Sequence, residues 1–323
     1  MKNTTVKALS FVIACIAMVV LMLLLIFWPL NNAGQNSYQI VTTNFIGYDL
    51  ARAITGGSSN IKMLLKPGTD AHNYEPTPQD IMDIEKANLF IYVGGESDQW
   101  VEELLQDNAI NDEHTLRLMQ LIAPLQEKII EGMTEDGGGV EDGLHADIEY
   151  DEHIWTSPKN TIALIEGIKN KLTELYPENA QKYSTNADAY ITSLEQADQT
   201  IANLVASSTK GTLIFGDRFP FRYFVEEYGL KYYAAFPGCA EQTEASSATI
   251  SFLIDKAKAE NIDTILKIEL SDGKLAETIA EEVGAKVLEL HSGHNISWDD
   301  FSSGTTYVDI INKNIKTLEE ALN

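Results

Sequence analysis

Residues 263–290, "DTILKIELSDGKLAETIAEEVGAKVLEL", contain two short apolar runs separated by a longer segment that ends on a glycine. The runs at 263–270 and 285–290 have the length of buried strands, and the segment 273–284 has the pattern of a helix. Strands that alternate with helices of this length predict a parallel sheet covered on both faces. This stretch therefore predicts an α/β fold.

The same alternation occurs in two parts of the chain. In the first part we expect a helix that begins at Thr77, because Pro78 suits the first helical position and Asp80 can complete the cap. The expected strands are 38–44, 61–66, 88–95, 212–217, 230–236, 263–270 and 285–290, and the expected helices are 47–57, 77–87, 220–229, 248–261, 273–284 and 306–322.

Between these two parts lies a long polar stretch of helical period without strands, which is typical of a rigid connector. The fold class that we predict is α/β, with two parallel-sheet lobes joined by a long rigid helix and preceded by one transmembrane or signal segment. The predicted domains are an anchor or signal segment with its linker, an N-terminal lobe, the connecting helix and a C-terminal lobe, at residues 1–37, 38–157, 158–210 and 211–323.

The N-terminal lobe contains an acid-rich insertion at residues 131–152, which has three consecutive glycines and no Lys or Arg. We expect a flexible loop there, because the segment has no apolar periodicity. Two roles remain open for it. The loop could raise the local concentration of cations, or it could act only as a solubilising insertion.

The N-terminus contains 23 uncharged residues from Ala8 to Leu30, after Lys2 and Lys7. This length fits a transmembrane helix better than the core of a signal peptide. Lysines before the span place the rest of the chain outside the cytoplasm. The alternative is lipidation at Cys15, which follows a loosely lipobox-like "VIA". Either reading predicts a body that is anchored at the cell membrane and extracytoplasmic.

The composition excludes several classes of function. A formal net charge of −25 disfavours nucleic-acid binding, which needs a basic surface. The two cysteines, Cys15 and Cys239, lie in the apolar span and in the body, so we expect neither a disulfide framework nor a cysteine-based zinc site. No glycine-rich phosphate-binding motif is present, which disfavours nucleotide chemistry.

Histidines follow the predicted strands of both lobes. His72 lies beyond the strand at 61–66, His153 follows the acidic loop, and His291 and His294 follow the strand at 285–290. Ligands in open α/β sheets bind at the carboxyl ends of strands, and neutral imidazole is a common ligand for zinc. We therefore expect a metal site in a cleft between the lobes. His114 and His145 have no such placement.

Two segments carry a family resemblance: "PGTDAHNYEPTPQD" at residues 67–80 and "DEHIWTSP" at residues 151–158. They resemble the paired patterns of the solute-binding proteins of zinc and manganese ABC transporters. The resemblance extends to residues 223–230 and 274–290. It implies two α/β lobes with a metal between them, and it implies His72 and His153 as the first two ligands.

The other two ligand positions depart from the family pattern. Where the family usually has its third histidine, five residues before Tyr223, this chain has Arg218, which has no lone pair for a metal. We expect Arg218 to turn away or to pair with an acid such as Glu244 or Glu269. The usual fourth ligand is an aspartate after the last strand, where this chain has His291.

The predicted ligands are therefore His72, His153 and His291, with Asp217 as a further carboxylate and His294 as the rival of His291. Three imidazoles with one carboxylate favour zinc, and manganese is the alternative.

The resemblance implies a receptor, not an enzyme, that captures a divalent ion and passes it to an ABC permease driven by a cytoplasmic ATPase. We expect a monomer. A metal-dependent hydrolase is the alternative from another class.

Overall fold

The body of the chain, from Tyr38 to Asn323, forms one compact unit. The structure, a computed structural model, describes residues 39–57, 60–107, 110–133, 149–240 and 244–323. The predicted anchor and residues 134–148 of the acidic loop lie outside these ranges. No helix in the described ranges is both long and apolar enough to cross a membrane.

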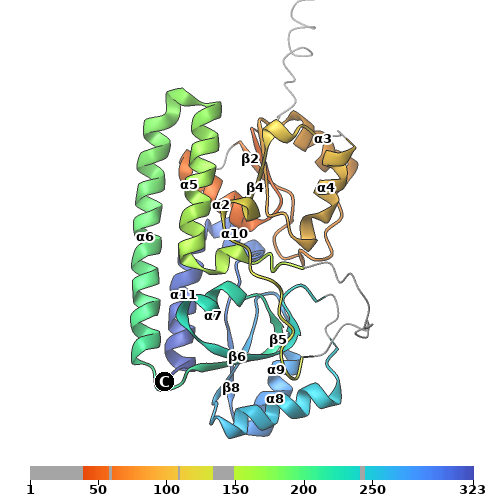
Figure 1. Ribbon diagram of the computed structural model, residues 1–323, viewed down its shortest axis with the longest axis vertical. Helices are drawn as coiled ribbons and strands as arrows, with labels where there is room; N and C mark the ends of the chain where they lie inside the picture. The colour runs from red at the N-terminus through yellow and green to blue at the C-terminus, as the bar shows by residue number, and fades with distance from the viewer. Residues whose placement is uncertain (1–38, 58–59, 108–109, 134–148, 241–243) are drawn as a thin grey trace, which may run out of the picture. The chain divides into compact units, whose positions relative to one another are not determined.

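The N-terminal lobe is built on a four-stranded, fully parallel sheet of order β2-β1-β3-β4 (Figure 1). The strands are β1 (Ile40–Thr42), β2 (Ile61–Met63), β3 (Leu89–Tyr92) and β4 (Thr115–Arg117). The sequence analysis did not expect β4, which has only three residues.

The C-terminal lobe has a second parallel sheet, of order β6-β5-β7-β8. Its strands are β5 (Thr212–Phe219), β6 (Lys231–Pro237), β7 (Thr264–Lys267) and β8 (Lys286–Glu289). The predicted fold class of two parallel α/β lobes is thus confirmed.

Helices cover both faces of each sheet. Along β3, Leu89 and Ile91 face one apolar cluster, while Phe90 and Tyr92 face another that includes residues of α3 and α4. This is the pattern of a strand buried on both faces. The helices of the two lobes are α2 (Phe45–Thr55), α3 (Pro78–Lys86), α4 (Gln99–Gln106), α7 (Arg222–Tyr228), α8 (Ser247–Ala259), α9 (Lys274–Val283), α10 (Trp298–Ser303) and α11 (Tyr307–Ala321).

The predicted cap of α3 is present. The Thr77 hydroxyl accepts a hydrogen bond from the Asp80 backbone N–H, the Asp80 carboxylate accepts one from the Thr77 backbone N–H, and Pro78 is the first helical residue. This cap fixes the end of the loop that carries His72.

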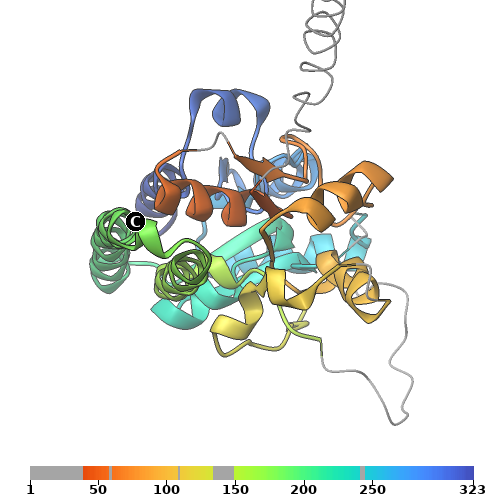
Figure 2. The ribbon, with the colours of Figure 1, turned by 90° about the horizontal axis from the view of Figure 1, so that it is seen from above.

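The structure corrects the connector, which is two helices instead of one. The helices α5 (Pro158–Leu175) and α6 (Ala180–Ser207) pack side by side as a hairpin (Figures 1 and 2). The first helix ends at Leu175, because the backbone of the next residue, Tyr176, leaves the helical region at φ −136° and ψ 68°. Pro177 follows, and a residue before proline is disfavoured in the helical conformation, so the helix stops there.

One apolar core runs through both lobes. It contains residues of α2, α5, α6 and α11 together with residues of both sheets, such as Ile91 in β3 and Phe215 in β5. The helix α6 contacts α2 of the first lobe and α11 of the second. The helical layer therefore fixes how the two sheets lie, and the loops at their carboxyl ends face one cleft.

Candidate metal centre

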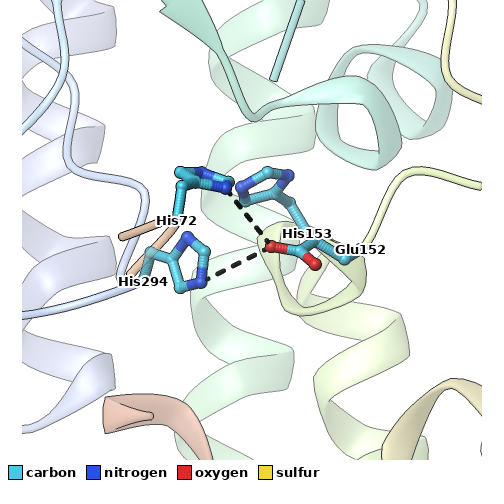
Figure 3. Close-up of side chains that lie close together, drawn as sticks. All are labelled: His72, Glu152, His153 and His294. Carbon is cyan, nitrogen blue, oxygen red and sulfur yellow. Dashed lines mark ion pairs between the residues drawn. The ribbon is translucent and has the colours of Figure 1, made fainter. Parts of the chain in front are cut away.

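Three histidines and one glutamate meet in this cleft. His72, Glu152, His153 and His294 each offer one ligand atom, and these atoms all lie within 4.8 Å of one another (Figure 3). The imidazole centroids are 5.0 to 5.9 Å apart. The cluster joins the loop after β2, the segment before α5 and the loop after β8.

His72 is held by the loop between β2 and α3. Its backbone N–H donates to the Asp70 carboxylate at 3.1 Å, and its Nδ1 lies 3.1 Å from the Ser97 hydroxyl. The same hydroxyl donates to Glu152 Oε1 at 2.5 Å. Ser97 therefore holds two members of the cluster next to each other.

His153 is oriented by the acid two residues before it. Asp151 Oδ1 accepts from the His153 backbone N–H at 2.8 Å and lies 3.2 Å from Nδ1 of the ring. A carboxylate on one ring nitrogen fixes the tautomer and leaves the other nitrogen, Nε2, free for a metal. Gly238 faces the ring so closely that a Cβ there would lie 3.2 Å from it.

Glu152 is buried, with 1% of its surface exposed. Its Oε2 accepts the Ser97 backbone N–H at 2.9 Å, while Oε1 lies 3.9 Å from His72 Nδ1 and 3.7 Å from His294 Nε2. Gly95 makes room for it, since a Cβ there would lie 2.2 Å from the glutamate Cβ. A buried carboxylate needs such partners, and a cation among the histidines would supply another.

His294 reaches the cluster because the loop after β8 turns at Gly293, which has φ +78°. Before the turn, the Ser292 backbone N–H and hydroxyl both donate to Glu269, and its carbonyl accepts the Trp155 indole N–H at 2.8 Å. The Trp155 ring also packs at 5.1 Å from the His294 ring. The family-like "HIW" segment thus sets the position of a candidate ligand on the other lobe.

The three imidazoles differ in their affinity for protons. Burial, followed by the charges of His153 and Arg218, lowers the pKa of His72 to about 3. Burial, followed by the charges of His153, His72 and Arg218, holds the pKa of His294 well below its usual value. Burial acts in the same direction on His153, but the neighbouring carboxylates, first of all Asp151, together outweigh it and the pKa is raised. His72 and His294 are therefore neutral at physiological pH, as metal binding requires.

The structure does not bring His291 into the cluster. Its Nδ1 accepts the Gly293 backbone N–H at 3.0 Å and lies 3.6 Å from Glu269 Oε2. Asn314 of α11 bonds both the backbone N–H and the carbonyl of His291. The ring lines a small internal cavity beside Tyr307, and the structure places His294, which the sequence analysis ranked second, in the cleft.

Asp217 also lies outside the cluster. Its carboxylate accepts the backbone N–H groups of Arg218 and Ile268 at 2.9 and 3.3 Å, so it ties the end of β5 to the end of β7. Burial raises the pKa of this carboxyl group. Arg218 pairs with Asp70 instead of with the expected Glu244 or Glu269.

The sequence analysis missed Glu152. It placed Asp151 and Glu152 in a flexible acidic loop, yet both are 1% exposed. The Asp151 backbone N–H donates to the Leu125 carbonyl at 2.9 Å, which orders this end of the loop. One signal was available, because "DEH" places a glutamate directly before the predicted ligand His153.

The donor set fits a zinc ion. Zinc bonds nitrogen and oxygen at about 2.0–2.2 Å, so the ligand atoms of a tetrahedral site are roughly 3.3 Å apart. The observed separations of up to 4.8 Å leave room for an ion that draws the side chains inward slightly. A cavity of about 700 Å³ adjoins the three histidines and gives the ion a way in.

Comparisons with known proteins find relatives of this chain among zinc-binding and zinc-uptake proteins. The sequence model of the family described as "Zinc-uptake complex component A periplasmic" matches residues 40–321. The chain is 29% identical over 289 residues to the zinc-binding lipoprotein AdcA of Streptococcus pneumoniae (strain ATCC BAA-255 / R6), covering 89% of this chain and 56% of that protein. It thus spans little more than half the length of that relative.

In two further matches, the similar region covers most of the matched protein or domain. The high-affinity zinc uptake system protein ZnuA of Bacillus subtilis (strain 168) is 27% identical over 287 residues, which are 88% of this chain and 87% of that protein. The Zn(II)-bound ZnuA-like domain of Streptococcus pneumoniae AdcA superposes with a TM-score of 0.70 at 27% identity, covering 88% of this chain and 98% of the domain.

Proposed function

Because the chain belongs to the family of the periplasmic component A of zinc-uptake complexes, we propose that its body is a receptor that captures a divalent metal ion between two lobes. One observation carries this proposal. Three imidazoles and one carboxylate from three separate segments, all nearly or fully buried, converge on a space of the size of one ion. The net charge of −25 suits a protein whose ligand is a cation.

We assign the ligands as His72, Glu152, His153 and His294. This set revises the sequence-based set, in which His291 and Asp217 stood in place of His294 and Glu152. The revision rests on distance, because the four assigned side chains form the compact group. The carboxylate of Asp217 is already used by two backbone N–H groups.

Zinc is the ion that these ligands favour. Imidazole nitrogen suits zinc, whereas manganese prefers more oxygen ligands and six-fold coordination. The relatives AdcA and ZnuA are named for zinc binding and zinc uptake, which supports the same assignment.

Capture fits the site better than catalysis. A catalytic zinc keeps one position open for water, while four protein ligands close a tetrahedral site. The ion would therefore be cargo. Its destination would be an ABC permease that a cytoplasmic ATPase drives, and the body would act as an extracytoplasmic monomer tethered at the membrane. The name of the AdcA lipoprotein supports tethering.

The test is metal content and competitive titration of residues 38–323 with zinc and with manganese. We expect one tightly bound zinc per chain and weaker manganese binding, with zinc binding lost in His72→Ala. Turnover of esters or phosphoesters that depends on the bound metal would instead support the hydrolase. Equal binding of zinc by wild type and His72→Ala would overturn the proposed site.

A further inference from the structure

An ion pair crosses the cleft next to the metal cluster. Arg218, on β5 of the C-terminal lobe, donates from Nη2 to Asp70 Oδ2 at 2.7 Å, and Asp70 lies on the loop of the N-terminal lobe that carries His72. The Arg218 side chain is 12% exposed and that of Asp70 is 38% exposed. Both residues line the cavity that His72, His153 and His294 also line.

Asp70 connects the arginine to a proposed ligand. One carboxylate oxygen, Oδ2, accepts from Arg218, and the other, Oδ1, accepts from the His72 backbone N–H at 3.1 Å. A guanidinium is planar and always charged, so it holds a carboxylate in a defined orientation. The position of Arg218 is therefore transmitted through Asp70 to His72.

The beginning of the same loop is held to the C-terminal lobe by neutral contacts. The Asn295 side-chain amide donates to the carbonyls of Lys66 and Thr69 at 2.8 and 2.6 Å, and the Gly68 backbone N–H donates to the Ile296 carbonyl at 2.7 Å. Arg218 makes the charged contact at the end nearest His72. Among the described residues of the C-terminal lobe, His294 is the one member of the metal cluster.

We propose that Arg218 and Asp70 form a latch that holds the His72 loop against the C-terminal lobe and so slows the escape of the bound ion. The proposal rests on the proposed function. The arginine stands where the family pattern has a histidine ligand, and the ion pair joins the lobes there in place of a metal bond. The Asp70 carboxylate offsets part of the repulsion that the Arg218 guanidinium exerts on positive charge at the histidines.

The charges of the pair predict an order among variants. Asp70→Asn removes the latch and leaves an unpaired guanidinium, which repels the ion. Arg218→Met removes the latch but leaves an unpaired carboxylate, which attracts it. We expect both variants to release zinc about tenfold faster, the size expected for a lost charged hydrogen bond. At equilibrium Asp70→Asn should bind zinc more weakly than Arg218→Met, with the double variant in between.

The experiment uses the purified full-length chain loaded with zinc. Release is followed after mixing with excess chelator, and equilibrium affinity is measured by competition. Arg222→Met is the matched control, because Arg222 pairs with Glu226 within α7. This substitution should leave the release rate unchanged. Melting temperatures of the zinc-free variants show whether the change acts on stability alone.

Two results would overturn the latch. The first is a rate of zinc release from Arg218→Met within twofold of the wild-type rate. The second is a double variant in which the effects of the two single changes on the release rate simply add. A different result would count against the proposed function itself. In that case wild type would hold no zinc, or His72→Ala would hold as much as wild type.

Discussion

The two sides of the metal cluster are built differently. On the N-terminal side, His72, Glu152 and His153 are held by Ser97 and Asp151, which lie in the same lobe. On the C-terminal side, His294 is placed by a turn whose contacts come from other parts of the chain, such as Trp155. On the first side, carboxylates two residues before His72 and His153 orient these histidines locally, whereas the second side depends on how distant segments pack.

The side chains around each histidine also differ in charge. Asp151 lies beside His153, so this ring has an ionic partner when it takes up a proton. His294 lies 3.7 Å from Glu152 Oε1, but burial and the charges of His153 and His72 hold its pKa low. The N-terminal side thus offers the metal a ring with raised proton affinity, and the C-terminal side offers one that stays neutral.

The largest expected effect comes from removing a ligand on the well-supported side. His153→Ala should weaken zinc binding by more than about 100-fold, since loss of a partner behind a ligand already costs roughly 10–100-fold. His291→Ala should leave zinc affinity unchanged, because that ring contacts Gly293 and Glu269 outside the cluster. Competitive zinc titration of both variants tests the comparison. A loss in His291→Ala equal to that in His153→Ala would restore the sequence-based ligand set.

The next effect concerns Glu152, the proposed ligand that was not predicted from the sequence. Glu152→Gln keeps the shape of the side chain but removes its charge, and we expect zinc affinity to fall by about 10- to 100-fold, the size of a charged contact of roughly 1.5–3 kcal/mol. Glu149→Gln is the control, because Glu149 is exposed in the same segment. Zinc titration of both variants tests whether Glu152 is a ligand. Equal zinc affinities of Glu152→Gln and Glu149→Gln would exclude it.

The difference between the two sides also explains what the sequence could and could not predict. His72 and His153 could be identified because each lies in a short pattern whose neighbours, such as Asp151, orient it locally. The strand before His291 suggested that this residue would face the cleft. Gly293 reverses the loop, and Asn314 holds the His291 backbone away, so His294 takes that place. Such contacts between distant segments leave no periodic pattern in the sequence.

For the fold, too, local sequence patterns were predictive and contacts between distant segments were not. Apolar runs and caps, such as the one at Thr77, predicted most of the strands and helices. The connector was expected to be one long helix with an interruption only at residues 175–183, whereas the break at Pro177 divides it into two helices. The alternation of strands and helices also could not show that Glu152 is buried, because its burial depends on Gly95 and Ser97 on a different loop.

A smaller effect should appear on acidification. His72 and His294 have lowered pKa values and stay neutral, so His153, with its raised pKa, is the imidazole whose proton competes with zinc. Below that pKa, affinity should fall by about tenfold per pH unit, as for one displaced proton. Zinc titrations between pH 7.5 and 5.5 test this slope.

Asp151→Asn removes the carboxylate that raises the pKa of His153, so the pH dependence should flatten. A thousandfold fall in zinc affinity per pH unit would indicate three displaced protons, and so three imidazoles with ordinary pKa values. That result would contradict the lowered pKa values of His72 and His294.

The smallest expected effect tests the turn on the C-terminal side. Gly293 has φ +78°, and a Cβ there would lie 2.9 Å from the Tyr307 ring and 3.6 Å from the Trp155 indole nitrogen. Gly284, at the end of α9, has φ +69° and open space around it. Alanine at either position should destabilise the body by roughly 1–2 kcal/mol, because a left-handed backbone is costly for a residue with a Cβ. Only Gly293→Ala should also weaken zinc binding, since its Cβ must displace the Tyr307 ring, which packs against the turn before His294. Thermal melts and zinc titrations of the two variants separate these effects. Unchanged zinc affinity in Gly293→Ala would show that the turn does not place His294.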